Sequence, residues 1–490
     1  MNLQRRLRTA IDSLTMYTVT LNGLRFLATV AIVLSAFNVL EYSTIFTLTA
    51  SITLLIVVCY ATNIALSKFY RIPVNQDSAF ITALILFFVL SMPSTTFDYI
   101  GLALAAIVAM ASKYIITWRS SVIFNPAAIG VFAVSITGLG SAAWWIADFV
   151  LIIPTLIVGT LILYKLRRFE LFFAFLIPAL TLIGLRSVSS GGTAQEALNL
   201  GLTVYPLLFL GAVMLTEPLT QPITRSKRLI YGAIVGIITA STFSLGFLQA
   251  SPLTALLVGN LFAFLVTHRV ATILTLVKKE QLTPTTFGFT FKSDKSLEYV
   301  PGQYIDMTIP GVKYNLRGNR RTFSIASHPS KGLIDVGVKF FENGSSFKQA
   351  FQKLEPGDRI IATNIAGEFT LPKKIEAPLV FVAGGIGITP FIPMIQDVIN
   401  RNLASKVTLY YFVRDESEIA FKTILRDAKN AGIAIKIRSG PDARLDIPTI
   451  KQHEAAHFYL SGPPGMVSGY KDTLKNNGIK HIQTDYFTGY

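Results

Sequence analysis

The stretch Leu379–Pro390, LVFVAGGIGITP, decides the fold of the C-terminal part of the chain, because an apolar run passes directly into a glycine-rich turn. Further apolar runs, separated by helical stretches, follow at 407–413, 434–437 and 457–461. This alternation predicts a parallel sheet of βαβ units, a Rossmann-like α/β nucleotide-binding domain at 376–490. Without side chains at Gly384, Gly385 and Gly387, the backbone lets a dinucleotide approach closely at the start of a helix.

Residues 271–375 have a different pattern, with short β-rich runs separated by Gly and Pro turns. Such spacing predicts a small β-barrel. Within it lies Arg321-Thr322-Phe323-Ser324. A guanidinium offers a charged fork to a pyrophosphate, so Arg321 is a candidate phosphate ligand. Phe323 and Tyr304 are aromatic candidates for packing against a ring.

The order of barrel, Arg-x-Phe-Ser, glycine turn and the closing Ser461-Gly462-Pro463-Pro464-Gly465 resembles the ferredoxin–NADP reductase family over about residues 271–490. The resemblance implies an FAD-binding barrel and hydride transfer from NADH or NADPH to FAD. The residues that it implies for FAD are Tyr304, Arg321, Thr322, Phe323, Ser324, Gly344, Ser346, Phe347 and Lys348. Those that it implies for the nicotinamide dinucleotide are Gly384, Gly385, Gly387, Thr389, Pro390, Arg414, Gly462 and Pro463.

The same resemblance implies three catalytic residues. Ser324 lies beside the reactive edge of the flavin, and Ser461 stands where the family often has cysteine. Tyr490, with Phe487 as an alternative, is the terminal aromatic residue that would cover the flavin. The choice between NADH and NADPH stays open. Arg414 after the second strand favours a ribose 2′-phosphate, whereas Asp415 and Glu416 argue against it; Arg438 and Ser439 are further candidates.

The composition of the 490-residue chain indicates a membrane protein. Its mean hydropathy is +0.52, and 51% of its residues are apolar. The net charge of +16 follows from Lys and Arg between apolar spans, so we expect no nucleic-acid partner. Cys59 is the one cysteine, which excludes a cysteine-ligated iron–sulfur cluster built by this chain alone. Of five histidines only His268 is near the membrane part, so we predict neither a haem pair nor a metal site.

Ten apolar spans are predicted in a membrane domain at 25–268, preceded by residues 1–24, a basic segment that is either amphipathic or frayed. The spans are 25–41, 45–66, 79–93, 99–116, 127–140, 143–163, 170–185, 200–215, 229–246 and 251–267. Basic residues, Lys113 among them, recur in alternate loops, which predicts a multi-pass inner or plasma membrane protein with both termini and the C-terminal domains in the cytoplasm. Trp144 and Trp145 are expected at the outer interface.

Three segments of this domain resemble a family of membrane proteins found in the Rnf electron-transport complex and in the sodium-pumping NADH:quinone reductase. They are Asn75–Ala79, Phe124–Gly130 and Thr216–Thr220 with the following span to Gly232. The resemblance implies a flavin in the membrane, and Asp77, Asn125, Thr216 and Glu217 are its candidate ligands, although each could equally be a helix cap. The family's flavin-bearing threonine is missing at Tyr205–Leu208, and Thr193 lies too early. A second flavin, FMN or riboflavin, is therefore expected to be non-covalent.

Three functions fit the sequence. The first is a membrane NAD(P)H dehydrogenase that passes electrons through the membrane flavin to an outer acceptor. The second is an NAD(P)H:quinone reductase without transfer across the bilayer. The third is a transporter gated by nicotinamide redox state, disfavoured because ionisable residues within the spans are scarce. The final acceptor and any partner subunits are not specified by the sequence.

Overall fold

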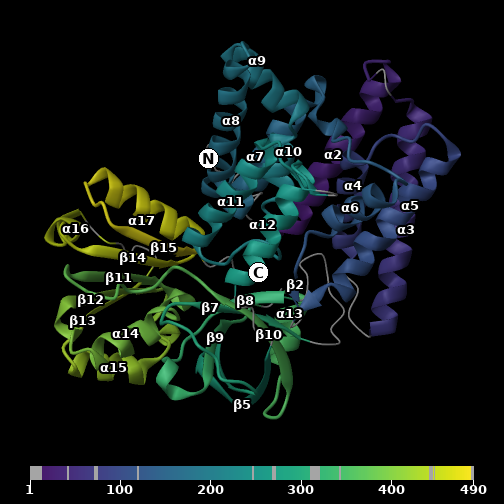
Figure 1. The fold of residues 1–490 in the computed structure, drawn as a ribbon. Coiled ribbons are helices and arrows are strands. Elements are labelled where there is room, and N and C mark those ends of the chain that lie inside the picture. Colours follow the sequence, from purple (N-terminus) through teal and green to yellow (C-terminus); the bar gives the residue numbers. More distant parts are fainter. Residues whose placement is uncertain are drawn as a thin grey trace. The chain divides into compact units, whose positions relative to one another are not determined.

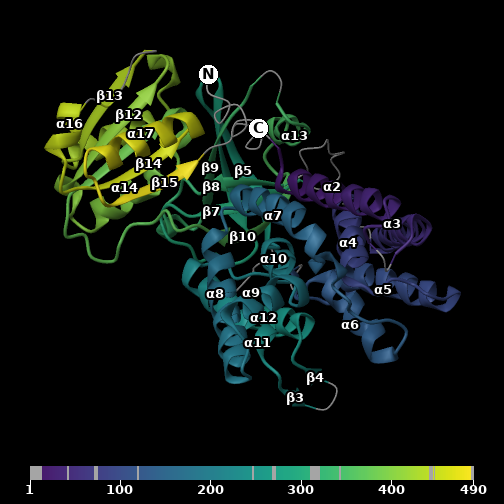
Figure 2. The same cartoon turned by 90° about the horizontal axis from the view of Figure 1, so that it is seen from above.

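The computed structural model describes residues 14–40, 43–70, 76–118, 121–245, 248–267, 272–309, 320–341, 344–440, 445 and 447–486. The chain forms two compact units, Met1–His268 and Arg269–Tyr490, and each is described by itself. Figures 1 and 2 show the N-terminal unit as a helical bundle and the C-terminal unit as two sheets with flanking helices. Of the predicted residues, Tyr490, Phe487 and His268 lie outside the described residues.

Five helices of the N-terminal unit are long and apolar enough to cross a membrane. They are α2 (Met16–Ala36), α3 (Ile45–Tyr70), α5 (Thr96–Ile115), α7 (Ile152–Leu166) extended by the 3₁₀ turn Phe149–Leu151, and α8 (Phe169–Ser189). Because α2 begins at Met16, residues 16–24 continue directly into the first apolar span.

The other predicted spans also fall on helices, but these are short. They are α4 (Gln76–Val89), α6 (Pro126–Thr137), α11 (Arg225–Ala240) and α12 (Pro252–Val266). The stretch from α9 (Ala194–Asn199) through α10 (Leu207–Phe209) to Met214 is bent by 62°, with Pro206 in the break. Among the described residues, five helices could each span a membrane by length and composition, or six if the bent pair counts as one span, where the sequence predicted ten.

One order of elements occurs twice in the N-terminal unit. In the first copy α5 leads through the hairpin β1 (Thr117–Trp118) and β2 (Ser121–Val122) to α6. In the second, α11 leads through β3 (Ser244–Leu245) and β4 (Leu248–Gln249) to α12. Both α6 and α12 start with proline, which lacks the N–H that a first turn leaves unpaired.

A polar side chain caps each of these proline-started helices. Asn125 accepts a hydrogen bond from the Ala128 amide, and Ser251 accepts one from the Thr254 amide. Both helices pack tightly on the preceding long helix. A Cβ at Gly130 would lie 2.4 Å from the Ala105 carbonyl oxygen, and one at Gly259 would lie 2.4 Å from Val235 Cγ2. The two copies therefore share both their start and their packing.

Trp144 and Trp145, which the sequence places at the outer interface, are packed against protein in the helical unit. Both are buried, at 6% and 8% exposure. The Trp145 indole donates to the Phe87 carbonyl at 2.6 Å, and its ring contacts Phe87 and Phe88. Phe209 packs on Phe88 from the bent helix pair. The hydrogen bond satisfies the indole N–H, so the tryptophan is stable within the bundle instead of at its rim.

The C-terminal unit begins with a six-stranded antiparallel sheet in the order β8-β7-β10-β5-β6-β9. The strands are β5 (Thr272–Thr283), β6 (Thr286–Ser293), β7 (Tyr304–Thr308), β8 (Arg320–Ser324), β9 (Ile334–Lys339) and β10 (Arg359–Ala366). Alternate residues such as Leu274, Leu276 and Ile305 are buried in one core, which α13 (Ser346–Gln352) closes with Phe347 and Phe351. This is the barrel that the turn spacing predicted.

The second sheet of this unit has five parallel strands in the order β13-β12-β11-β14-β15. They are β11 (Leu379–Gly384), β12 (Val407–Val413), β13 (Ala434–Ser439), β14 (His457–Gly462) and β15 (Ile482–Tyr486). Helices α14 (Phe391–Asn400) and α15 (Lys422–Asn430) cover one face, and α16 (Ile447–Gln452) and α17 (Pro464–Asn476) cover the other (Figure 1). Strand β15 was not among the predicted strands.

Candidate functional site

A crevice forms where the strand order of the parallel sheet reverses. From β11 the chain proceeds to β12 and β13 on one side, and β14 lies on the other side. Ligands of such sheets bind outside the carboxyl ends of the strands at this reversal. The strands end in Gly384 and Gly462, with Ala383 directly beside Ser461. The two predicted walls of the nicotinamide slot are therefore brought together.

The glycines of this crevice are needed because the two turns touch through their backbones. A Cβ at Gly387 would lie 2.5 Å from the Ser461 carbonyl oxygen and 2.6 Å from Gly462 Cα. A Cβ at Gly384 would lie 2.5 Å from Met466 Sδ. Gly385 has a φ of +53°, in the left-handed region that favours glycine. The glycines thus allow the turns after β11 and β14 to pack directly against each other.

Ser461 offers an unused polar group at the same place. The residue is fully buried, and its hydroxyl has no hydrogen-bond partner among the described residues. A buried hydroxyl without a partner costs free energy until a ligand supplies one. This orphaned hydroxyl and the tight glycine turns fit a nicotinamide dinucleotide.

Thr389 and Pro390 follow the glycine turn and connect it to α14. The Thr389 hydroxyl donates to the Ile386 carbonyl at 2.9 Å, and the side chain is 1% exposed. Its methyl group faces Gly337 of β9, where a Cβ would come within 2.8 Å. Pro390 precedes the first residue of α14. Both residues hold the glycine turn against the barrel, with the Thr389 hydroxyl already engaged.

The predicted FAD residues gather on one face of β8 and on α13. Strand alternation puts Arg321 and Phe323 on the same face. The Arg321 guanidinium lies 5.5 Å over the Phe347 ring, and Phe323 packs 5.2 Å from Phe351. Phe323 is half-buried, which leaves part of its ring for a ligand. Gly344 and Ser346 flank Ser345, the N-cap of α13.

The other face of β8 holds different residues. Thr322 is exposed and donates to Asp306 at 2.6 Å, so it is not brought together with Arg321 and Phe323. Ser324 is 7% exposed and pairs with Tyr304 across the two strands. Tyr304 is half-buried and lies against Gly367. The side chains of the contiguous motif Arg321–Ser324 therefore lie on two opposite faces of the sheet.

Lys348 fits the role of a second cation for the FAD pyrophosphate. Burial, with a smaller contribution from nearby Arg321, lowers the pKa of Lys348 to about 8. Its ammonium donates to the Lys339 carbonyl at 3.1 Å and lies over the Phe341 ring. Two mutually repelling cations beside each other favour an anion between them. The pair thus suits a diphosphate.

This pKa predicts how FAD affinity depends on pH. An anionic ligand raises the pKa of Lys348, so FAD binding takes up a proton once the pH exceeds about 8. We expect FAD affinity to be flat from about pH 6.5 to 8 and then to fall by up to about tenfold per pH unit. Titration of the apoprotein with FAD at a series of pH values, followed by flavin fluorescence, measures this affinity. Lys348→Arg, which stays charged, should remove the slope; an unchanged slope in that variant contradicts the assignment.

Arg414 and Arg438 stand at the carboxyl ends of two neighbouring strands. Arg414 is exposed directly after β12, and Val413 pairs with Ser439 at the end of β13. The Asp415 carboxylate accepts the Ser417 amide at 2.8 Å, and hydrogen bonding to Ser417 lowers the pKa of Asp415. The acid that argued against a 2′-phosphate is therefore engaged in capping a 3₁₀ turn.

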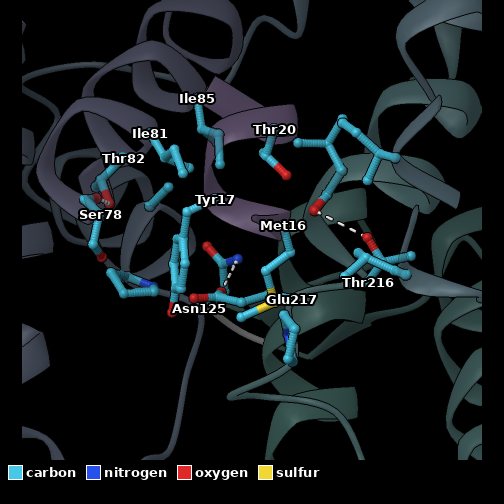
Figure 3. A pocket seen from close by; sticks show the side chains of 16 residues that line it. Met16, Tyr17, Thr20, Ser78, Ile81, Thr82, Ile85, Asn125, Thr216 and Glu217 are labelled. Atoms are coloured by element: carbon cyan, nitrogen blue, oxygen red, sulfur yellow. Dashed lines mark hydrogen bonds between the residues drawn. The ribbon is translucent and has the colours of Figure 1, made fainter. Parts of the chain in front are cut away.

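The N-terminal unit contains a pocket that three of its four predicted ligands line (Figure 3). The space between its lining residues, open solvent at the mouth included, is about 610 Å³. It is bordered by the N-terminal parts of α2 and α6, by α4 from Ser78 to Ile85, by the C-terminal part of α7, and by residues between Val213 and Pro218. Asn125, Thr216 and Glu217 line it, whereas Asp77 does not and its neighbour Ser78 does.

Hydrogen bonds fix the polar wall of this pocket. The Asn125 amide nitrogen Nδ2 donates to Glu217 Oε2 at 2.7 Å, while its Oδ1 caps α6. The Thr216 hydroxyl donates to the Ala212 carbonyl at 2.7 Å. Behind them Asn260 accepts the Asn125 backbone N–H and donates to Thr220 and Tyr231. Asn260 was missed because its contacts are 29 or more residues away in sequence.

Thr193 has a structural role. Its hydroxyl accepts a hydrogen bond from the Glu196 amide, and the Thr193 amide donates one to the Glu196 carboxylate, which forms a capping box at the start of α9. The segment Tyr205–Leu208 lies at the break between the two halves of the bent helix pair. Neither place offers a threonine at the pocket.

Comparison with protein families identifies both domains of the C-terminal unit. Residues 273–370 match the oxidoreductase FAD-binding domain, and residues 377–437 match the ferric reductase NAD binding domain. The phenol hydroxylase P5 protein of Acinetobacter pittii is 27% identical over 44% of this chain and 64% of that protein. A flavohemoprotein of Halalkalibacterium halodurans is 33% identical over 43% of this chain and 57% of that protein.

A solved structure of similar fold is the flavohem-like FAD/NAD binding domain of nitric oxide dioxygenase from Vibrio cholerae O1 biovar El Tor. It shares 23% identity over 44% of this chain and 98% of that chain, with a TM-score of 0.39. The chain spans 64% and 57% of the lengths of the two curated relatives named above.

The two matched domains define the C-terminal unit as that of a flavin-dependent NAD(P)H oxidoreductase. This unit is of the ferredoxin–NADP reductase type, as the order of motifs predicted. In this chain the two domains follow a unit of apolar helices.

Proposed function

We propose that this protein is a membrane NAD(P)H dehydrogenase that delivers electrons from cytoplasmic NAD(P)H, through FAD and a second, non-covalent flavin, to an acceptor on the outer side. The carrying observation is that Asn125, Thr216 and Glu217, distant in sequence, meet in one pocket of the apolar helical unit. Similarity of the surrounding segments to the membrane proteins of the Rnf complex and the sodium-pumping reductase supports a flavin there. The basic alternate loops support cytoplasmic placement of the reductase.

FAD, when bound, supplies a group that accepts a hydride as two electrons and releases electrons singly. The chain's own residues position and shield it. Arg321 and Lys348 would hold the diphosphate, and the exposed part of the Phe323 ring would pack against the flavin. Gly384, Gly387 and Ser461 let the nicotinamide lie close enough for hydride transfer, for which reacting atoms must be about 3–3.5 Å apart.

The packing of the helical unit favours electron transfer over solute transport. The pocket runs along α4 from Ser78 to Ile85. Buried Phe87 and Phe88 follow in the last turn of α4, in contact with Trp145, which precedes α7. A layer of packed rings therefore lies directly beyond the α4 wall of the pocket. Electrons can cross such a layer, but a hydrated solute needs a polar path.

The first test is the flavin content of the purified full-length protein. We expect FAD and one further flavin per chain, both released by acid precipitation. FAD alone would contradict a membrane flavin and favour direct quinone reduction. A flavin that stays with the precipitate would show covalent attachment. Sealed vesicles supplied with NAD(P)H inside then test direction: an impermeant outer acceptor must be reduced, and one that stays oxidised contradicts transfer across the bilayer.

We also propose NADPH as the preferred donor, and Arg414 as its determinant. Loss of a charge-assisted contact costs about 1.5–3 kcal/mol. We therefore expect Arg414→Ser to lower kcat/KM for NADPH by about 10- to 100-fold and to leave NADH within about twofold. Arg426→Ser, an exposed site on α15, is the control. Equal losses with both nucleotides would show that Arg414 does not meet the 2′-phosphate.

A further inference from the structure

Lys113 is not a loop residue, as its place in the charge pattern suggested, but belongs to the last turn of α5. Its ammonium turns inward to α4 and donates three hydrogen bonds. They reach the Ser78 carbonyl at 2.9 Å, the Ser78 hydroxyl at 2.8 Å and the Thr82 hydroxyl at 2.8 Å. A lysine near a helix end normally extends to water. Holding this one inward indicates a use for its charge inside the bundle.

Both hydroxyl groups that Lys113 holds line the pocket. Ser78 and Thr82 stand on one side of it, and Thr216 stands on the other (Figure 3). Lys113 itself is not among the lining residues, so its charge stands one side chain behind the α4 wall. The Thr82 hydroxyl accepts from Lys113 and donates to the Ser78 carbonyl at 2.8 Å. These bonds set the direction of the Thr82 hydroxyl.

The opposite charge lies on another wall of the pocket. Glu217 is held by Asn125, and its carboxylate is near enough to act on the charge of Lys113. The first turn of α4, which contains Ser78, adds the positive end of a helix dipole to the lysine side. A ring in the pocket would therefore have a positive wall on one side and a negative one on another.

We propose that Lys113, acting through Ser78 and Thr82, is a positioning residue that stabilises the electron-rich, reduced form of the flavin ring in this pocket. The inference rests on the proposed membrane flavin and adds how the pocket changes the reduction potential of that flavin. The ring gains negative charge on its carbonyl edge when it is reduced, and a nearby cation in a weakly screened site lowers the free energy of that form. Lys113 thereby raises the reduction potential of this flavin and favours its taking electrons from FAD.

The test is a redox titration of the full-length protein in detergent, after its flavins have been counted. FAD provides an internal control, because its domain is unchanged. In Lys113→Met we expect at least a tenfold loss in the one-electron reduction equilibrium of the second flavin, a shift of about 59 mV to lower potential. Lys113→Arg, which keeps a positive charge, should keep most of the wild-type reduction potential of the second flavin. Lys68→Met, at the exposed last turn of α3, should have no effect.

The outcomes separate the two proposals. If the wild type holds no second flavin, or a quinone in its place, the proposed function fails before any variant is made. If Lys113→Met keeps the flavin at an unchanged potential, the role of Lys113 is overturned. If that variant releases the flavin, Thr82→Val decides: it keeps the charge but removes a hydroxyl through which Lys113 acts. A lower potential there supports the proposal, and an unchanged one overturns it.

Discussion

Gly387→Ala is expected to lower the rate of FAD reduction by NAD(P)H at least about 100-fold while leaving the FAD content unchanged. The added Cβ would lie 2.5 Å from the Ser461 carbonyl oxygen and 2.6 Å from Gly462 Cα. Because both are backbone atoms, no side-chain rotation relieves the contact and the two turns must separate. A displacement of about 1 Å at a reacting geometry costs roughly 100-fold in rate.

Anaerobic stopped-flow bleaching of the flavin measures this step directly. Gly465→Ala is the matched control, since a Cβ there meets nothing within 4 Å and the residue lies in the same turn region. FAD binding depends on the barrel and should survive in both variants. If Gly387→Ala reduces FAD at the wild-type rate, the crevice between β11 and β14 is not the nicotinamide site.

The parallel sheet and its crevice could be predicted because their signals are local. An apolar strand, a glycine turn and a helix follow one another within Leu379–Asn400. β15 was missed because its five residues, IQTDY, include three polar ones and form an edge strand with one neighbour. Thr322 was placed with Arg321 because the motif is contiguous, although strand alternation sends neighbours to opposite faces.

The helical unit was less predictable because its informative contacts are non-local. Apolar composition located the helical stretches, but helix length depends on where Pro126, Pro206 and Pro252 interrupt or start a helix. From sequence alone, a basic residue near the end of a span could equally lie in a loop or point its side chain into the helical bundle. For Lys113 the choice depends on acceptors 31 and 35 residues away. The spacing of residues in the sequence does not show that these acceptors lie next to Lys113.

Asn125→Ala is expected to remove most of the second flavin and to leave FAD and its reduction by NAD(P)H unchanged. The side chain caps α6 and donates to Glu217 at 2.7 Å, so truncation loses both bonds in the wall of the pocket. Loss of the cap costs about 0.5–2 kcal/mol. A hydrogen bond to a charged group such as the Glu217 carboxylate contributes about 1.5–3 kcal/mol. Together they predict at least about a tenfold loss of flavin affinity.

The repeated architecture supplies the control for this prediction. Ser251 caps α12, which also starts with proline, by the same side-chain contact to the third residue of the helix, yet it is not among the residues that line the pocket. Ser251→Ala therefore costs a similar cap without touching Glu217, and should keep the second flavin. Asn125→Asp retains a cap but sets a carboxylate against Glu217, so it should lose the flavin as Asn125→Ala does. If all three variants keep the second flavin, Asn125 does not hold a flavin in the pocket. If Ser251→Ala loses the second flavin as Asn125→Ala does, the loss comes from weaker helix capping and not from the contact with Glu217.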